Sequence, residues 1–510
     1  MHPAVDVLLK VLSQGGEGEP EAAEEQAGVV GGLARVYEQA RSAMEYRAEH
    51  LVRRAAVERI LKRQMLFNQN PDFLARQLLT ELRWARYVTP SEIEHVEKGD
   101  VSLIIGKYLT ALAEAGDRLP YDWVVGVLSA EIEERLNLNI DYGHFTHFAF
   151  QVIKQKLEVV ENEKNWDLLV FIATDKAYGQ SDDQQVGYHI VKLLDSDWGR
   201  LGRSETLLEA RELYVYGINH PLTVKLAKYV RSQSAPLILL RDVYFAAPEK
   251  FRELMADREA FEKRAKSVLS TQLLHMSGRV NRATARSVIY VFLTKMLFGM
   301  LVEVPMDLLL VGEIATTPLL INLLFPPSLM WLVSMGSWLP GIVEQKALVH
   351  ETWRVVGEFE TLGEEKLWLG GQSRRAKGLL YGVFSAMYIV VFLAVFAAIF
   401  YLLQLLKFSL ASQIVFVFFL SIVAFFAYRI RQTSLIYNWS PKEGGGQSLG
   451  DMIALPLLAV GSKLSLGISK LNFLVFIFDF ILEAPFKTIL RFLDSWVQFL
   501  SVKRDEVVGN

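Results

Sequence analysis

Three charged residues stand inside a hydrophobic stretch of this 510-residue sequence: Lys295, Glu303 and Asp307. Counting about 100° per residue from Lys295, Glu303 falls at about 80° and Asp307 at about 120° around a helix. Glu313 falls close to the starting direction again. A helix that continues through Pro305 would therefore carry one polar stripe. Because a charge in the bilayer core costs roughly 2.5–3.5 kcal/mol, such a stripe is typical of residues that handle ions or protons.

A second interpretation places Glu303, Asp307 and Glu313 at a membrane interface, beyond a short or kinked span. Lys295 would then be paired or would extend its ammonium toward the interface. From the sequence we favour this second interpretation and keep the ion-handling stripe as the alternative.

Motifs for known chemistry are scarce. The sequence contains no Gly-x-x-x-x-Gly-Lys-Ser/Thr, no Gly-x-Gly-x-x-Gly and no His-Glu-x-x-His. It has 0 cysteines, which excludes disulfides and thiolate chemistry. His144 and His147 could bind a metal from one helix face, but only Asp141 is in register, so two partly buried histidines are the better interpretation. We predict no metal, no cofactor and no catalytic residue, and we favour a protein that is not an enzyme.

A narrow charged stripe also occurs near the C-terminus, on a segment that is otherwise Phe, Leu, Ile, Val and Trp. Within an arc of about 120° it contains Asp479, Glu483, Lys487, Arg491 and Asp494. This pattern favours an amphipathic helix lying in the membrane interface. A span with its stripe turned toward other helices is the alternative.

Charge is distributed unevenly along the chain. The formal net charge is −3, with 54 basic and 57 acidic residues, so no nucleic-acid partner is expected. Hydrophobic residues make up 51% of the sequence. The first 286 residues are charged throughout, whereas the remainder contains long runs with almost no charge. This asymmetry predicts a water-soluble region followed by a membrane region.

Two segments are long and apolar enough to cross a bilayer, because residues 378–404 and 411–428 contain no charge. The basic residues that flank the hydrophobic segments predict their cytoplasmic ends: Arg279, Arg282, Arg286, Arg374, Arg375, Lys377, Arg429 and Arg431. The short connection with Lys407 is then expected outside. Residues 287–310 and 318–336 either both cross or both form a re-entrant hairpin.

The predicted fold class is all-α: a helical cytoplasmic domain, a helical transmembrane region of about four segments, and a C-terminal amphipathic helix. Only 168–174 resembles a buried strand. The predicted organisation is a flexible acidic linker at 1–30, a helical domain at 31–286, a charged, proline-containing membrane hairpin at 287–337, a cytoplasmic loop at 338–377, a transmembrane hairpin at 378–430, a Gly-rich linker at 431–450, and amphipathic interfacial helices at 451–510.

The first predicted helix of the soluble region, at about 33–67, has a basic face. That face carries Arg47, Arg53, Arg54, Arg59, Lys62 and Arg63. It could lie on an anionic membrane or bind phosphates. We favour a solvated face whose arginines pair with Glu49 and Glu58 across helical turns.

Several phrases resemble a functionally uncharacterised family of bacterial multi-pass membrane proteins, over roughly residues 37–340. They are Met44-Glu-Tyr-Arg-Ala-Glu-His-Leu51 with Arg53 and Arg54, Asn219-His-Pro-Leu222, and Phe292-Leu-Thr-Lys-Met296 leading to Glu303-Val-Pro-Met-Asp307. A resemblance resting on fewer residues is to the LETM family of organellar cation-exchange proteins, through Leu324-Phe325-Pro326 after an acidic, proline-containing hydrophobic segment. The first resemblance implies a membrane architecture and the second implies cation exchange.

Two functions are compatible with these features. The first, which the sequence favours, is a membrane-anchored interaction or scaffold protein whose helical cytoplasmic domain binds a protein partner or a second copy. The alternative is a cation or proton transporter or channel that uses Lys295, Glu303 and Asp307. Both place the chain in the cell (inner) membrane, in contact with the lipid bilayer, with a cytoplasmic N-terminus and no cleaved signal.

Overall fold

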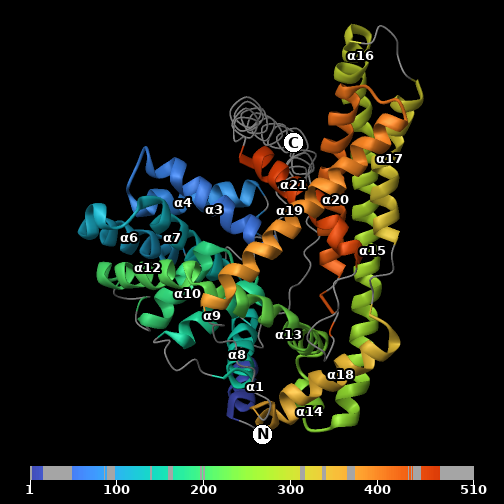
Figure 1. Ribbon diagram of the computed structural model, residues 1–510. Coiled ribbons are helices and arrows are strands. Elements are labelled where there is room, and N and C mark those ends of the chain that lie inside the picture. Colours follow the sequence, from blue (N-terminus) through green and yellow to red (C-terminus); the bar gives the residue numbers. More distant parts are fainter. Residues whose placement is uncertain are drawn as a thin grey trace, which may run out of the picture. The chain divides into compact units, whose positions relative to one another are not determined.

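The fold is that of a computed structural model (Figure 1). It describes residues 3–14, 49–85, 87–88, 98–137, 141–158, 165–195, 198, 202–310, 316–335, 340–363, 374–434, 436–437, 439 and 449–470. Throughout these residues the regular structure is helical and no β-strand occurs. The predicted all-α class is therefore confirmed. The segment 168–174, which resembles a strand in sequence, lies in helix α9 (Trp166–Ala177) instead.

The chain divides into two compact units. The first unit comprises 1–234 with 358–369, and the second comprises 235–357 with 370–476. The division falls within helix α13 (Pro221–Ala246), next to Pro236. It does not fall at residue 286, where the sequence predicts the end of the soluble domain, because helix α15 (Arg258–Phe298) runs through that position without a break.

The first unit is an array of short helices around one apolar core. Its helices are α1 (Pro3–Gln14), α3 (Glu49–Met65), α4 (Pro71–Trp84), α6 (Lys98–Ala115), α7 (Tyr121–Leu136), α8 (Asp141–Lys156), α9, α10 (Asp183–Leu194) and α12 (Ser204–Asn219), with short turns η1 (Gly116–Arg118) and η3 (Phe359–Gly363). Helix α7 is central, because it packs against α3, α6 and α10 and is buried along most of its length.

Local sequence signals explain where several of these helices begin. Asn70 caps α4 by accepting a hydrogen bond from the Phe73 amide at 3.0 Å, and Pro71 occupies the first helical position. Asp182 and Gln185 form a capping box at the start of α10. These caps satisfy amide groups that have no partner inside the helix.

Two predicted loops are helical in the structure. Within the predicted linker 1–30, residues 3–14 form α1, whose Val5, Leu8 and Leu12 are buried. Within the predicted loop 338–377, residues 342–357 form helix α18 (Ile342–Gly357), which packs against α15. In both places an apolar stripe at helical spacing finds a helix to cover it, a contact that composition alone does not reveal.

The second unit is built on long helices. It contains α14 (Phe251–Leu254), α15, a π-helical turn η2 (Gly299–Glu303), α16 (Val304–Leu310), α17 (Thr316–Met335), α18, α19 (Arg374–Leu405), α20 (Leu410–Ser434) and α21 (Leu449–Lys470). Figure 1 shows α15, α17 and α20 running beside one another. α15 and α17 are antiparallel, because Val291 meets Met330 in one cluster while Glu303 meets Asn322.

The C-terminal end of α20 revises one further prediction, and the packing of α21 adds a contact that the sequence did not predict. α20 continues to Ser434, into the predicted linker 431–450, and the Tyr437 hydroxyl then donates to Asp242. α21, predicted to be interfacial, packs along α20. The two backbones approach so closely at Gly461 that a Cβ there would lie 2.1 Å from the Ser421 carbonyl oxygen.

Candidate functional site

Lys295 is buried because it belongs to the inward stripe of α15. Buried or partly buried residues recur along this helix at intervals of three and four: Leu269, Leu273, Met276, Val280, Thr284, Val288, Val291 and Lys295. The stripe faces α17 and α20 over its C-terminal half. A lysine at the next position of this pattern is therefore forced into the packed interior.

The π-helical turn η2 brings Glu303 toward the same side as Lys295. A π turn advances each residue by roughly 80–90°, compared with about 100° in an α-helix. Glu303 therefore moves closer to the direction of Lys295 than regular α-helical spacing predicts. The turn immediately precedes Pro305, which has no N–H to donate to a carbonyl in the preceding turn. Proline and π turn together replace the continuous polar stripe with a convergent pair.

Asn322 of α17 and Ser412 of α20 hold one oxygen of the Glu303 carboxylate. The Asn322 side-chain amide and the Ser412 hydroxyl both donate to Glu303 Oε1. All three side chains are buried. The carboxylate thus joins three helical segments that are distant in sequence.

The second oxygen of Glu303 has no hydrogen-bond donor in the described part of the chain, and Lys295 forms an ion pair with it. Lys295 Nζ lies 3.6 Å from Glu303 Oε2, and each side chain is 1% exposed. The same ammonium lies 4.5 Å from the centroid of the Phe419 ring, in cation–π geometry. We refer to Lys295, Glu303, Asn322, Ser412 and Phe419 as the Glu303 cluster.

The Glu303 cluster is under-satisfied in hydrogen bonds. Three of its buried atoms have no hydrogen-bond partner in the described part of the chain: Lys295 Nζ, Glu303 Oε2 and Asn322 Oδ1. The Lys295–Glu303 contact is an ion pair, but it is too long for a good hydrogen bond. Unsatisfied buried polar groups are rare in folded proteins, and those that persist are often functional.

Asp307 lies on α16, one turn beyond Glu303, and is 4% exposed. The Ser409 hydroxyl donates to Asp307 Oδ1 at 2.6 Å and accepts from the Ser412 amide at 3.1 Å. Asp307 is therefore linked to the start of α20.

The sequence-based candidates are only partly brought together. Lys295 and Glu303 form an ion pair, and Asp307 is also buried. The pairing of Lys295 agrees with the favoured interpretation, whereas the position of the two acids at a membrane interface stays a prediction. Glu313 lies outside the described residues, as do Asp479, Glu483, Lys487, Arg491 and Asp494.

The basic flanking residues all fall in helices. Arg279, Arg282 and Arg286 are exposed on α15. Arg374, Arg375 and Lys377 lie in the first turn of α19, and Arg429 and Arg431 lie in the last turns of α20.

Sequence reasoning missed Asn322, Ser412, Ser409 and Phe419. Asn322 is the one amide side chain within α17, and the two serines stand at the start of an otherwise apolar segment. A search for isolated polar residues in apolar runs would have found Asn322 and Ser412. Their convergence on Glu303 could not have been found in this way.

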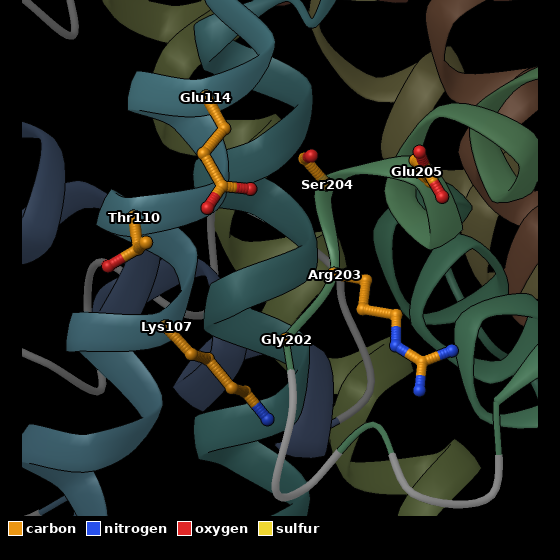
Figure 2. A pocket seen from close by; sticks show the side chains of 7 residues that line it. All are labelled: Lys107, Thr110, Glu114, Gly202, Arg203, Ser204 and Glu205. Atoms are coloured by element: carbon orange, nitrogen blue, oxygen red, sulfur yellow. The ribbon is translucent and has the colours of Figure 1, made fainter.

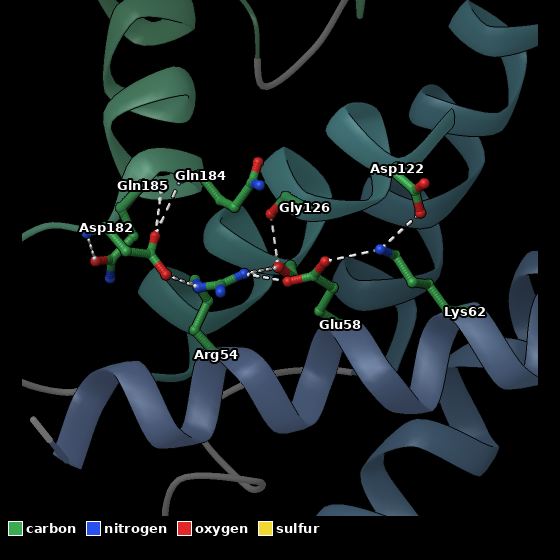
Figure 3. A network of polar contacts seen from close by, with 9 residues as sticks. Arg54, Glu58, Lys62, Asp122, Gly126, Asp182, Gln184 and Gln185 are labelled. Carbon is green, nitrogen blue, oxygen red and sulfur yellow. Dashed lines mark hydrogen bonds and ion pairs between the residues drawn. The ribbon is translucent and has the colours of Figure 1, made fainter. Parts of the chain in front are cut away.

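On the predicted basic face of α3, Arg54 is buried and Lys62 is half-buried, and both are paired (Figure 3). Arg47 lies outside the described residues. Arg54 is 4% exposed and forms ion pairs with Glu58 at 2.7 Å and Asp182 at 2.6 Å. Its guanidinium also donates to Ser129 at 2.9 Å. Lys62 pairs with Glu58 and with Asp122. These cations therefore join α3 to α7 and α10. The predicted pairing of Arg54 with Glu58 across one helical turn is confirmed, whereas the predicted solvation of Arg54 is wrong because its side chain is buried.

A second buried carboxylate, Glu131 of α7, has a complete set of donors. Tyr108 and Trp198 donate to Glu131 Oε2 at 2.8 Å and 2.9 Å, and Lys107 donates to Oε1. The Lys107 ammonium also lies 4.9 Å from the Trp198 ring centroid. This network packs α6 against α7.

His189 of α10 lies between two carboxylates. Its Nδ1 donates to Asp175 Oδ2 at 2.7 Å, and its Nε2 lies 3.5 Å from Glu134 Oε2. Burial disfavours the imidazolium, but Asp175 and Glu134 outweigh it and raise the pKa of His189 to about 10. Burial likewise opposes the charge on Glu134, yet His189 and Lys192 lower the pKa of that carboxyl to about 2. The group is a permanent ion triad near neutral pH.

We assign no function to the His144–His147 pair or to the hollow beside α6. His144 is partly buried and His147 exposed on α8, and no cluster of potential metal ligands occurs among the described residues. A hollow of about 450 Å³ lies between α6 and the start of α12 (Figure 2). Two carboxylates, Glu114 and Glu205, line it beside Arg203, and its Lys107 is already paired with Glu131.

One Gly-x-Ser-x-Gly run does occur, at 446–450. In hydrolases that motif follows a strand and turns sharply into a helix. Here its last two residues begin α21, and no strand occurs in the described chain. We do not assign a nucleophile to it.

Among the described residues, one helix is long and apolar enough to cross a membrane, at Gly382–Leu405. Shorter apolar helical stretches occur at Thr316–Leu332, Ser412–Tyr428 and Ala454–Leu464. No family model, curated protein or solved structure matches the chain. The assignment of a function therefore rests on the chemistry of the residues.

Proposed function

We propose that this protein is a multi-pass membrane protein that transports a cation or proton through the Glu303 cluster. The observation that carries the proposal is a buried, incompletely hydrogen-bonded Lys295–Glu303 pair surrounded by apolar helices. Ionisable groups in such surroundings are rare, and they mark ion paths and proton relays more often than structural contacts.

A membrane setting is supported by the surface of α19. Apolar side chains such as Val390, Leu393 and Leu402 are exposed around this helix. A continuous apolar surface of this size is unfavourable in water and favourable in lipid. The proposed topology has a cytoplasmic N-terminus, with α15 to α17 and α19 to α20 as two hairpins in the inner or only cell membrane.

Transport is supported by the ligand chemistry of the cluster. A carboxylate, a hydroxyl and an amide oxygen can replace the hydration shell of a cation or accept a proton. A structural ion pair, by contrast, stabilises the fold most when every donor and acceptor has a hydrogen-bond partner. Because Glu303 Oε2 and Asn322 Oδ1 have no hydrogen-bond partner, they favour a site that binds and releases a cation over a purely structural ion pair.

Ion flux in liposomes tests the proposal. Purified protein is reconstituted, and the flux of Na⁺, K⁺ and protons is followed after imposing a gradient. We expect flux that Glu303→Gln reduces at least tenfold, because the amide carries no charge. Lys407→Gln is the matched control, since Lys407 is an exposed lysine in the connection before α20. Wild-type flux no greater than in empty liposomes, or full flux in the Glu303 variant, contradicts the proposal.

Cysteine labelling tests the topology, because the chain has 0 cysteines of its own. Single cysteines replace Lys407 and Arg279, both exposed. A membrane-impermeant thiol reagent on intact cells should label position 407, and position 279 only after permeabilisation. Labelling of both positions on intact cells would contradict the proposed orientation.

A second candidate function is a membrane-anchored interaction protein that binds partners through the first unit. It is supported by the separate core of that unit and by exposed Val215, Tyr216 and Val224 around the junction of α12 and α13. Val224→Glu in the full chain should abolish binding of a defined partner and leave ion flux unchanged. Loss of partner binding in Glu303→Gln alone would instead assign binding to the second unit.

A further inference from the structure

The Glu303 cluster already holds a cation, the ammonium of its own Lys295. That ammonium is attracted by a carboxylate oxygen and an aromatic face, yet it makes no hydrogen bond to either. The site therefore attracts a positive charge while coordinating the present occupant poorly.

We propose that the Glu303 cluster is a binding site for one small monovalent cation, and that Lys295 is a tethered competitor for it. This inference rests on the proposed function for its role in transport. It adds the class of ligand and the residue that controls occupancy. Lys295 is a positioning and regulatory residue here, whereas Glu303, Asn322 and Ser412 contact the ion.

The ligands are oxygens, as a hard cation requires. Glu303 supplies its carboxylate, with Oε2 unpartnered at present. Asn322 supplies Oδ1, which is also unpartnered and reaches the ion by rotation of the side-chain amide. Ser412 supplies the lone pairs of a hydroxyl that now donates to Glu303. These residues come from η2, α17 and α20, so binding would tie three segments together.

Charge balance sets the stoichiometry. The Lys295–Glu303 pair is neutral, and an added cation would leave one uncompensated charge in a site that is almost free of solvent. The balanced step is Lys–NH₃⁺ + M⁺ → Lys–NH₂ + bound M⁺ + H⁺. The nitrogen keeps its electron pair, the proton leaves to water, and no redox partner is needed. A divalent ion bound to the same pair would leave a net charge of one even after this release.

Few other charges face the pair. Asp307 of α16 is the nearest in sequence and is held by Ser409. α17 contains no ionisable side chain, and the charged residues of α20, Arg429 and Arg431, lie at its opposite end. Arg279, Arg282 and Arg286 of α15 are exposed, so Lys295 is the one buried cation among the described side chains of the elements packed around Glu303.

The test measures cation binding and proton release at equilibrium. The full chain in lipid nanodiscs, in weak buffer, is titrated with NaCl, KCl or NH₄Cl, with choline chloride as the blank. Calorimetry reports binding and a pH indicator reports protons. We expect about one proton released per ion bound, and a Kd that rises about tenfold for each unit by which the pH is lowered in the range where Lys295 is protonated.

Lys295→Met should bind the ion without releasing a proton, with a Kd that no longer depends on pH. If Lys295 had only a structural role, its substitution would leave the dependence of Kd on pH unchanged. Glu303→Gln should abolish binding, and Ser412→Ala should weaken it about tenfold. Lys407→Gln should behave as wild type. The chromatographic profile and thermal unfolding show whether each variant is folded. If Lys295→Met does not fold, the weaker binding expected for Ser412→Ala still tests the proposed ion ligands.

Other results overturn the inference. Binding without proton release, or an unchanged pH slope in Lys295→Met, removes Lys295 as competitor. Equal heats with choline chloride, or tighter binding of CaCl₂ than of the monovalent salts, would contradict the proposal that the ligand is a small monovalent cation. Flux without equilibrium binding would leave the proposed function standing as proton transport and reject this site. Binding without flux would keep the site and reject transport.

Discussion

The two units bury a glutamate in opposite ways. Glu131 of the first unit is 6% exposed and receives hydrogen bonds on both oxygens, from Tyr108, Trp198 and Lys107. Glu303 of the second unit is more deeply buried, yet one of its oxygens has only an ion-pair contact with Lys295.

This difference in hydrogen bonding indicates that the two buried glutamates have different roles. A pair with complete hydrogen bonds recovers much of the cost of removing two charges from water and holds its helices in one arrangement. A pair with free donors and acceptors recovers less, and it can exchange a partner at lower cost. We therefore interpret the Glu131 network as structural and the Glu303 cluster as the exchangeable site.

The largest effect is expected at Glu131. Glu131→Ala leaves the buried Lys107 ammonium without its carboxylate, with only the Trp198 carbonyl oxygen at 3.4 Å to accept from it, and removes the acceptor of the Tyr108 hydroxyl and the Trp198 indole N–H. Loss of one partner of a buried ion pair costs about 3–5 kcal/mol. Hydrogen exchange of peptides from α6 and α7 in the full chain should show this loss of protection.

Arg135→Ala on the same helix is the control, because its pair with Asp100 at 2.8 Å is exposed and is worth about 0–1 kcal/mol. Equal protection in the two variants would mean that the Glu131 network does not stabilise the first unit.

Stability is expected to stay the same or to increase when both members of the Lys295–Glu303 pair are replaced. Lys295→Met with Glu303→Gln replaces two buried charges by neutral groups of similar size. Such replacements are neutral or stabilise by about 1–4 kcal/mol. The melting temperature in detergent should be unchanged or higher, while ion flux is lost. Each single variant should melt lower than the double variant, because it leaves one charge alone. A double variant that melts below both singles would show that the pair is structural after all.

A smaller loss is expected at Arg54. Arg54→Met leaves Glu58 with Lys62, and leaves Asp182 with the amides of Gln184 and Gln185 that it already caps. The remaining cost is about 1–3 kcal/mol, for lost charged hydrogen bonds. This loss of stability is measured as reduced protection of α3 and α10 peptides against hydrogen exchange. A loss as large as that of Glu131→Ala would contradict the view that redundant partners protect this network.

The last prediction concerns the pH dependence of stability that the His189 triad causes. Because the folded-state pKa of His189 is raised to about 10, its contribution to stability is complete below its unfolded value and is lost as the pH rises through about 10. Glu134, lowered to about 2, contributes above its unfolded value and loses this contribution as the pH falls toward 2. His189→Gln should flatten the stability profile of the first unit between pH 7 and 10. A profile identical to wild type would exclude the triad as its cause.

The all-helical class could be predicted without a structure, because apolar residues recur at helical intervals along most of the sequence. The sequence also pointed to Lys295, Glu303 and Asp307, since charge inside an apolar run stands out without any structure. Residues 3–14 and 342–357 were misjudged because each becomes a helix only when another helix covers its apolar face.

Which polar groups contact one another depends on how the helices pack. Regular helical spacing separated Lys295 from Glu303, and the π turn before Pro305 brought them together. Asn322 and Ser412 are 19 and 109 residues from Glu303 in the chain, so their contact depends on how α17 and α20 pack against η2. Arg54 looked like part of a solvated basic face for the same reason. Burial and partner choice are properties of packing between elements, and the periodicity of a single segment does not contain them.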